Sequence, residues 1–225
     1  ITKAGQFAQV SAEGFFLRRP ISICDIDKEK GTIRLVFEVR GKGTDKISEL
    51  NKGDSIDIIA PLGNGFKVLD GKKAICIGGG IGTPPMVGIA KEYGKNATVI
   101  SGFRSANAVI LQDDFKAQGN ETILCTDDGT SGIHGFVTDA LKEKLQTEKP
   151  DIIYACGPMP MLKAVVTIAE EYGIESQVSL EQRMACGVGA CLVCVCRTVK
   201  DGKEIFSHVC TDGPVFDGKE VDFNG

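Results

Sequence analysis

The alternation of apolar strands with amphipathic helices between about residues 72 and 175 constrains the fold most strongly. Strands are expected in "KKAICIGGG", "NATVISGF", "ETILCTDDG" and "PDIIYACG". Helices are expected in "TPPMVGIAKEYG", "DDFKAQG", "FVTDALKEKLQTEK" and "PMPMLKAVVTIAEEYG". In the first helix, Thr83 is expected at the N-cap, Pro84 at the first helical position and Gly94 just past the end. This alternation predicts a doubly wound parallel sheet with helices on both faces.

The segments on either side follow other patterns. Short runs rich in β-branched and aromatic residues, "GQFAQV", "RRPISICDI", "TIRLVFEVR" and "DSIDIIA", precede residue 70 and predict a small antiparallel β-barrel or sandwich. The C-terminal part is rich in Gly and Cys, and "LVCVCRTVKDGKEIFSHVC" predicts a hairpin that turns at Asp201-Gly202. We therefore expect a β-barrel or sandwich over 1–70, an α/β domain over 71–175 and a small subdomain over 176–225.

Composition excludes several classes of function. The formal net charge is -4, which gives no general attraction to nucleic acid or to anionic membranes. No apolar run is long enough to predict a transmembrane helix. The nine cysteines are an odd number in a long chain, which does not suit a secreted disulfide scaffold. We expect a protein of the reducing cytoplasm, without nucleic-acid or membrane partners.

Clustered cysteines near the C-terminus predict a metal centre. Three of them follow the spacing C-x4-C-x2-C and a fourth lies further on, which is the plant-type [2Fe-2S] spacing. The predicted ligands are Cys186, Cys191, Cys194 and Cys210. Gly187 and Gly189 would let the loop wrap the cluster, and Cys196 does not fit the spacing and is expected to be a core thiol. The alternative is a zinc site, which usually uses two separated C-x2-C pairs.

Two strand-to-helix turns and one basic pair are candidate ligand-binding segments. The glycine loop "GGGIGTPPM" suits the approach of a pyrophosphate to a helix N-terminus, although a tight structural turn explains it equally well. "ACGPMP" lies at the carboxyl end of another strand, where it is either a binding loop or a plain helix start. "RRPIS" offers an arginine to a phosphate, or is an exposed strand end.

Together these motifs resemble the ferredoxin reductase family. Arg19-Pro20-Ile21-Ser22 is similar to its flavin-binding R-x-x-S signature, and the two strand-to-helix turns resemble its nicotinamide-nucleotide signatures. The C-terminal cysteines, ending in "HVCTDGPVF", narrow the resemblance to the electron-transfer subunits of class B dihydroorotate dehydrogenases. The resemblance covers nearly the whole chain, although family members carry about a strand or more before "AGQF", so the chain is expected to begin inside the barrel.

The resemblance implies the cofactors and the residues that bind them. FAD is expected against Arg19, Pro20, Ile21, Ser22, Val36, Phe37, Glu38, Gly43 and Thr44. NAD(H) is expected against Gly78, Gly79, Gly80, Gly82, Thr83, Cys156, Gly157 and Pro158. The family implies NAD, but Arg104 stands where an acidic residue would hold the ribose of NAD, which leaves NADP open from the residues alone. No catalytic acid or base is expected.

The expected function is electron transfer. NADH gives up two electrons as a hydride and an iron-sulfur cluster accepts one at a time, so a flavin must stand between them. The partner implied by the family is a catalytic, FMN-containing dihydroorotate dehydrogenase subunit of pyrimidine biosynthesis, in a heterotetramer. The uncharged loop "ACGVGACLVCVC" suggests that this partner docks over Gly187 to Ala190. The alternatives are a flavin subunit of a bifurcating NADH-dependent ferredoxin:NADP reductase, a monooxygenase reductase, and a zinc-stabilised binding module without redox activity.

Overall fold

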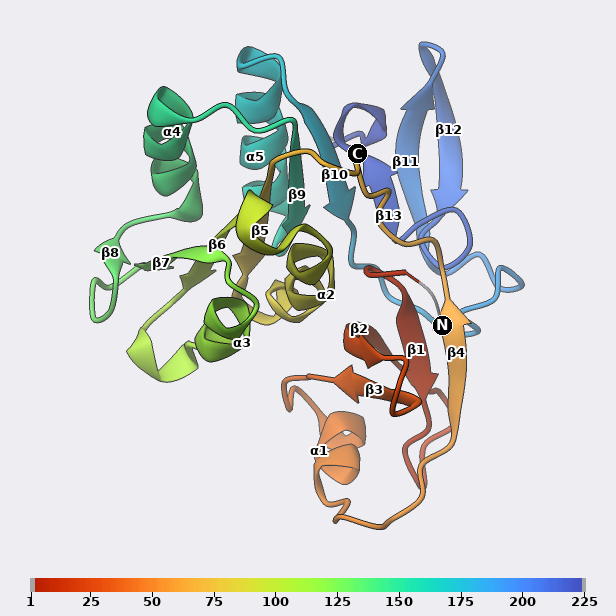
Figure 1. Ribbon diagram of the computed structural model, residues 1–225. Helices are drawn as coiled ribbons and strands as arrows, with labels where there is room; N and C mark the ends of the chain where they lie inside the picture. The colour runs from red at the N-terminus through yellow and green to blue at the C-terminus, as the bar shows by residue number, and fades with distance from the viewer. Residues whose placement is uncertain (1–2, 224–225) are drawn as a thin grey trace.

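The N-terminal part of the chain folds into an antiparallel sheet with one short helix. The computed structural model describes residues 3–223. In this sheet β1 (Phe7–Val10), β2 (Arg19–Asp27), β3 (Thr32–Leu35) and β4 (Ile58–Leu62) take the order β3-β2-β1-β4 (Figure 1). The ends of the sheet, β3 and β4, are not paired with each other within the described residues. The predicted barrel is therefore represented by four of its strands as an open sheet.

Two strands of this sheet differ from the ranges expected from the sequence. The run 32–40 was expected to be one strand, but β3 ends at Leu35 because Val36 packs against the core of the parallel sheet instead. The run 54–60 was expected to be a strand, but its first residues are exposed and β4 starts at Ile58. A helix that the sequence did not predict, α1 (Lys42–Ser48), lies between β3 and β4.

The middle of the chain forms the predicted parallel sheet. Its strands are β5 (Ala74–Gly79), β6 (Ala97–Phe103), β7 (Glu121–Thr126), β8 (Ile133–His134), β9 (Ile152–Cys156), β10 (Glu175–Ser179) and β13 (Val215–Asp217). They take the order β13-β10-β9-β5-β6-β7-β8, and β13 alone runs antiparallel to its neighbour. The sheet thus draws β10 and β13 from beyond residue 175.

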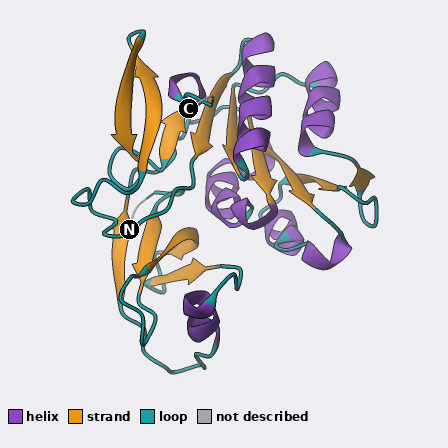
Figure 2. Cartoon of the chain, turned by 180° about the vertical axis from the view of Figure 1, so that it is seen from behind, coloured by secondary structure: helices purple, strands orange, loops and turns teal. Residues whose placement is uncertain are grey.

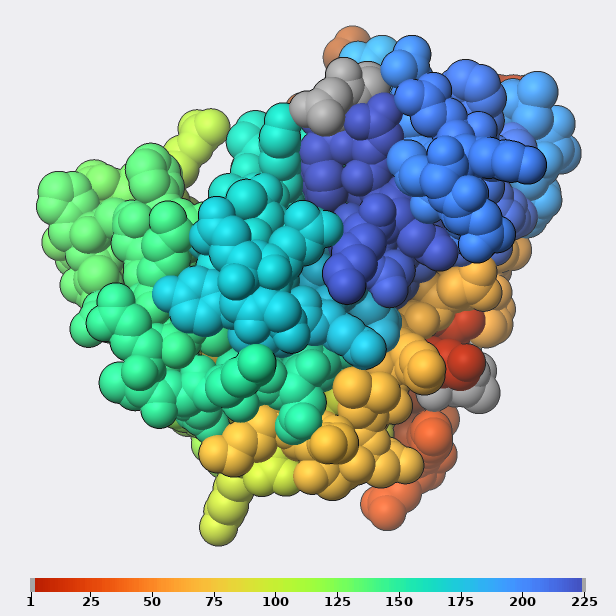
Figure 3. Space-filling model, turned by 90° about the horizontal axis from the view of Figure 1, so that it is seen from above, coloured from red at the N-terminus to blue at the C-terminus, as the bar shows by residue number. Residues whose placement is uncertain are grey.

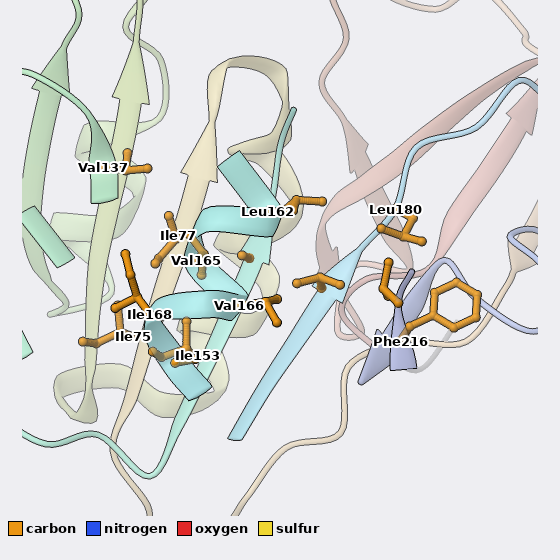
Figure 4. Close-up of a cluster of buried hydrophobic side chains, with 14 of the residues drawn as sticks. Ile75, Ile77, Val137, Ile153, Leu162, Val165, Val166, Ile168, Leu180 and Phe216 are labelled. Atoms are coloured by element: carbon orange, nitrogen blue, oxygen red, sulfur yellow. The ribbon is translucent and has the colours of Figure 1, made fainter. Parts of the chain in front are cut away.

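Helices cover both faces of this sheet (Figure 2). α2 (Pro84–Tyr93) and α3 (Gln112–Ala117) bury apolar side chains on one face, and α4 (Val137–Thr147) and α5 (Met159–Glu171) on the other. Figure 4 shows the second of these cores, in which Leu162 and Val165 of α5 pack over Ile77 of β5. Full burial of each such side chain contributes about 1.5–3 kcal/mol, so this core accounts for much of the stability of the domain. Short 3₁₀ turns lie at Gly80–Gly82, Gly94–Asn96, Ala106–Ala108 and Gly218–Glu220.

The C-terminal part contains the predicted hairpin. β11 (Val195–Lys200) and β12 (Lys203–His208) pair antiparallel, and the turn residues Asp201 and Gly202 have φ of 52° and 72°. Two consecutive positive φ values are what a tight two-residue hairpin turn requires. After the hairpin the chain returns to pair β13 with β10, and its last described residues lie beside α5 (Figure 3). The loop that carries most of the clustered cysteines therefore follows β10 of the parallel sheet. After the hairpin the chain returns to the same sheet at β13.

Candidate functional site

A pocket rich in cations lies beside the start of β2 and the start of α1. It has a volume of about 580 Å³ and is lined by Phe15, Arg19, Arg40, Gly41, Lys42, Gly43, Thr44 and Arg183. Four of these residues are basic, so the pocket suits an anionic ligand. The volume lies in the range of about 300–1,000 Å³ that is typical of ligand and cofactor sites.

The arginine of the predicted flavin motif is held in this pocket by its neighbours. The Arg19 guanidinium occupies the space that a side chain on Gly43 would fill, so Gly43 has to be a glycine for Arg19 to lie there. The guanidinium carbon also lies 5.0 Å from the centre of the Phe15 ring, and Nη1 donates a hydrogen bond to the carbonyl of Leu17. A planar guanidinium fixed in this way matches a phosphate group.

The other predicted flavin residues surround the same corner of the sheet. Pro20, Ile21 and Ser22 follow Arg19 along β2, while Val36, Phe37 and Glu38 lie in the extended segment after β3. The Glu38 carboxylate accepts a hydrogen bond from Arg40 Nε at 2.7 Å, and the hydroxyl of Thr44 accepts one from the backbone N–H of Arg40 at 3.0 Å. These bonds connect the segment after β3 to the first turn of α1.

Five residues of this pocket were not predicted from the sequence: Phe15, Arg40, Gly41, Lys42 and Arg183. In the sequence "RGKG", basic residues alternate with glycines, a pattern typical of phosphate-binding loops. This pattern could have identified Arg40 and Lys42 as candidate phosphate-binding residues. Arg183 reaches the pocket from the segment after β10, so no local pattern could have identified it.

The glycine loop lies at the carboxyl ends of the central strands. Gly78 and Gly79 end β5, the next three residues form a 3₁₀ turn, and Thr83 occupies the N-cap of α2 as predicted, although its side chain makes no capping hydrogen bond. Its hydroxyl oxygen is buried without a partner among residues 3–223. Gly80 has a φ of 53°, and no atom lies within 4 Å of the position that its Cβ would take. The turn therefore has an open position over its backbone, which a ligand is free to occupy.

The second turn, after β9, packs directly against the glycine loop. A Cβ on Gly82 would lie 2.6 Å from the carbonyl carbon of Cys156, and a Cβ on Gly157 would lie 3.1 Å from Cα of Gly79. β5 and β9 are neighbours in the sheet. The chain continues from β5 to β6 on one side of this pair, and from β9 to β10 on the other side. This is the switch point at which ligands bind in open α/β sheets. Pro158 occupies the N-cap of α5, so it starts the helix on the far side of the turn.

Cys156 is a protonated thiol in this site. Burial raises its pKa to about 12, although a hydrogen bond with Ser179 of the neighbouring strand acts in the opposite direction. A thiol with so high a pKa is not a thiolate nucleophile at neutral pH. Its side chain is therefore small, neutral and polarisable at neutral pH.

The four cysteines that were predicted to bind metal lie in two pairs. The thiols of Cys186 and Cys191 are hydrogen-bonded to each other, and so are those of Cys194 and Cys210. No three His, Cys, Asp or Glu side chains among residues 3–223 converge on one metal-ion position. Two thiol pairs fit a cluster with two iron positions, each of which takes two thiolates, better than a single tetrahedral zinc ion.

The loop around Cys186 directs backbone N–H groups at its sulfur. The N–H groups of Val188 and Ala190 lie 3.4 Å and 3.3 Å from the sulfur. These bonds, that of Val188 above all, lower the pKa of Cys186 to about 6. Gly187 and Gly189 have φ of 72° and 82°, the conformation that lets the loop turn these groups inward. The loop is thus built to stabilise a thiolate at this position.

Three other thiols of the segment, those of Cys194, Cys196 and Cys210, are buried. Burial raises the pKa of Cys210 to about 11, and a hydrogen bond with Cys194 acts in the same direction. Burial also raises the pKa of Cys196 to about 11, and its side chain belongs to the main hydrophobic core. Cys196 therefore lies where the sequence analysis expected it, in the core next to the metal-binding loop.

The outer side of the loop is apolar. Val188, Leu192 and Val193 are 52%, 64% and 51% exposed, and no charged residue interrupts the run 185–196. Soluble monomers rarely leave adjacent apolar side chains in water, and such a surface is typical of an interface. No helix among residues 3–223 is both long and apolar enough to cross a membrane.

Two known families match the two parts of the chain described above. Residues 76–167 match the oxidoreductase NAD-binding domain, and residues 181–222 match the iron-sulfur cluster binding domain of dihydroorotate dehydrogenase B. The first match includes both turns at the switch point, and the second includes all four paired cysteines.

Curated relatives match almost the whole chain. The electron transfer subunit of dihydroorotate dehydrogenase B (NAD(+)) from Fusobacterium nucleatum is 43% identical over 97% of this chain and 86% of its own length. The subunit of the same name from Listeria monocytogenes serotype 4a is 45% identical over 96% of this chain and 86% of its own length.

Solved structures share the fold. A chain of the NADH-dependent reduced ferredoxin-NADP oxidoreductase superposes with a TM-score of 0.86 at 34% identity, over 99% of this chain and 80% of that one. An Amycolatopsis cytochrome P450 reductase superposes with a TM-score of 0.65 at 26% identity, over 76% of this chain and 57% of that one. The arrangement is therefore ferredoxin reductase-like.

Proposed function

The chain belongs to the family of dihydroorotate dehydrogenase B electron-transfer subunits, and on this premise we propose how its residues carry electrons between NAD(H), FAD and a [2Fe-2S] cluster. The observation that carries the proposal is the pairing of four thiols, three from the loop after β10 and one from beyond β12, in a chain that also has a cation-lined pocket and a sheet switch point. When bound, the flavin would accept one hydride, which carries two electrons, and pass these electrons singly to the cluster. Every other contribution comes from the positions of this chain's own groups.

The cation-lined pocket is proposed to hold the FAD pyrophosphate. Arg19 is fixed over Gly43 and would make the planar contact to phosphate, while Arg40, Lys42 and Arg183 add positive charge. Pro20, Ile21 and Ser22 would continue along β2 under the flavin ring. Val36, Phe37, Glu38 and Thr44 would complete the site from the segment after β3 and from α1. The proposed FAD site therefore combines residues from β2, from the segment after β3 and from α1.

The switch point is proposed to hold NAD(H). The pyrophosphate would lie in the open space beside the backbone of Gly80. Thr83 has a buried hydroxyl without a partner among residues 3–223, which would be able to hydrogen-bond to the nucleotide. Gly78, Gly79, Gly82 and Gly157 allow the two turns to pack closely, and Pro158 begins the helix beyond them. Cys156, a neutral thiol, would contact the nicotinamide without acting as a nucleophile. The site orients the nucleotide and requires no catalytic acid or base of the protein.

The two thiol pairs are proposed to be the iron ligands. Cys186 with Cys191, and Cys194 with Cys210, would supply two thiolates to each iron. Backbone N–H groups of the loop would stabilise the negative charge on the sulfurs.

The proposed division of the chain is a flavin domain over 1–70, a nucleotide domain over 71–175 and a cluster subdomain over 176–225. The sheet of the second domain also includes β10 and β13.

The final electron acceptor or donor is proposed to be a separate catalytic subunit. The exposed apolar side chains of Val188, Leu192 and Val193 lie in the cluster loop, where a docked partner would cover them. We propose that this partner is an FMN-containing dihydroorotate dehydrogenase subunit, docked over Gly187 to Ala190 in a heterotetramer. Capturing this chain from its native cell and identifying the copurifying protein tests the proposal. A dihydroorotate dehydrogenase subunit in fixed stoichiometry supports it, and a chain that elutes as a monomer at native concentration contradicts it.

A second candidate is the flavin subunit of an NADH-dependent ferredoxin-NADP oxidoreductase. The TM-score of 0.86 over nearly the whole chain favours it, although the identity of 34% is lower than that of the dihydroorotate dehydrogenase relatives. The same capture experiment separates the two functions, because this alternative predicts a copurifying partner other than a dihydroorotate dehydrogenase subunit.

The cofactor content is tested on the purified protein. After anaerobic purification we expect one FAD per chain. We also expect two iron atoms per chain, because each of the two thiolate pairs would bind one iron. Zinc bound in place of iron would contradict the proposed function and favour a structural metal site.

A further inference from the structure

One fully buried side chain of the first strand has no hydrogen-bond partner in the part of the chain that the structure describes. Gln9 of β1 is 0% exposed, and neither Nε2 nor Oε1 of its amide has a hydrogen-bond partner among residues 3–223. Its neighbours in the strand, Phe7, Ala8 and Val10, are buried hydrophobic residues. A buried amide without partners is costly, since its hydrogen bonds to water are lost and not replaced. A ligand that the chain binds at this place would supply the missing partner.

The amide of Gln9 faces the loop that carries the paired cysteines. A Cβ on Gly187 would lie 2.7 Å from Nε2 and 2.7 Å from Cγ of Gln9, so the amide fills the space beside the residue that follows Cys186. Phe7, two positions earlier and therefore on the same face of β1, belongs to the core that includes Cys194 and Cys210. The face of β1 that carries Gln9 is thus turned toward the metal-binding loop.

The same strand position adjoins the flavin motif. Gln9 pairs directly with Pro20 of β2, the residue after Arg19 in the predicted flavin signature. The backbone of Gln9 is therefore paired with the strand that is proposed to hold the flavin. Its side-chain amide faces the loop that is proposed to hold the cluster, since a Cβ on Gly187 would lie 2.7 Å from it.

We propose that Gln9 is a positioning residue that donates a hydrogen bond from its side-chain amide to a sulfur of the bound [2Fe-2S] cluster. This inference rests on the proposed function, because it needs the cluster in the loop. A hydrogen bond to a cluster sulfur stabilises the added negative charge of the reduced state, and such bonds are among the factors that set cluster potentials. Gln9 then raises the reduction potential of the cluster and favours transfer of an electron from the flavin to it.

The test compares three substitutions in the purified holoprotein, with potentials measured by an EPR-monitored redox titration. Gln9→Met keeps the length of the side chain and removes the donor, and Gln9→Glu keeps its shape and adds a negative charge. We expect both to lower the cluster potential, the first by about 59 mV if the equilibrium constant for reduction falls tenfold, and the second by more. Gln9→His keeps an N–H donor and should retain most of the wild-type potential.

A matched control separates this effect from a general disturbance of the strand. Gln6→Met makes the same change at a residue whose amide donates to the carbonyl of Gly63 at 3.0 Å, whereas the amide of Gln9 faces Gly187. It should leave the cluster potential unchanged. The flavin potential should stay unchanged in every variant.

Two results would overturn the inference. One is a Gln9→Met protein that holds its full iron content with the wild-type cluster potential, and the other is a shift of the flavin potential in place of the cluster potential. If the Gln9→Met protein loses the cluster, the Gln9→His protein becomes the deciding variant. A Gln9→His protein that also loses the cluster would show that Gln9 has only a steric role, and this result would also overturn the inference. A wild-type protein without the cluster would instead refute the proposed function, so the two failures are distinguishable.

Discussion

The open position over Gly80 gives the sharpest test of the proposed nucleotide site. Replacing Gly80 with Val introduces no clash within the described chain, since nothing lies within 4 Å of the new Cβ. The residue does have a φ of 53°, and forcing a residue with a Cβ into that conformation costs about 1–2 kcal/mol. For a chain of this size we expect a Tm about 2–8 °C lower. The fold and the bound flavin should otherwise be retained.

The effect on the nucleotide should be larger than the effect on stability. The two methyl groups of Val would occupy the position that we assign to the pyrophosphate. Loss of one or two charged hydrogen bonds, at about 1.5–3 kcal/mol each, predicts that KM for NADH rises at least tenfold. Steady-state reduction of an artificial acceptor by NADH measures it.

Gly71→Val is the matched control. Gly71 has a φ of 70° and also has nothing within 4 Å of its Cβ, but it lies in the turn before β5 and away from the switch point. It should lower Tm by a similar amount and leave KM unchanged. If the two variants raise KM equally, or if Gly80→Val leaves KM at its wild-type value, the pyrophosphate is not bound at this glycine.

Three further predictions concern the other two sites and the partner. Cys186→Ser should remove or severely weaken the cluster, whereas Cys196→Ser should leave iron content and the EPR spectrum intact, and the reverse result would shift the ligand assignment. Gly43→Ala should release FAD because its methyl group overlaps the Arg19 guanidinium, whereas Gly31→Ala, in the turn between β2 and β3 and with nothing within 4 Å of its Cβ, should retain it; flavin content after gel filtration measures both. Val188→Glu should separate the chain from its partner without loss of NADH-dependent reduction of artificial acceptors, and a variant that copurifies with its full complement of partner refutes the interface.

The central strands of the parallel sheet were predictable from the sequence because they are buried on both faces. "KKAICIGGG" and "PDIIYACG" are continuous apolar runs, and β5 and β9 occupy them, with the helices between them close to their predicted ranges. The hairpin turn at Asp201-Gly202 was also confirmed, because two residues that tolerate positive φ specify it locally.

The elements that the sequence analysis missed depend on contacts between distant segments. α1 has only seven residues and too few apolar positions to show a helical period. β13 has three residues, and its pairing with β10 defines it as a strand. Arg183 enters the flavin-type pocket, and Gln9 meets the cluster loop, only because the C-terminal segment folds back over the first sheet. No spacing or local composition encodes such contacts.

Anaerobic addition of NADH to the isolated protein tests the central claim most directly, because it follows electrons through all three proposed sites. The flavin absorbance should bleach, and the EPR signal of a reduced [2Fe-2S] cluster should appear in the same sample, with no partner subunit present. A flavin that bleaches while the cluster stays oxidised even with excess NADH, or an iron centre that NADH reduces after the flavin has been removed, would contradict the proposed path from NADH through the flavin to the cluster.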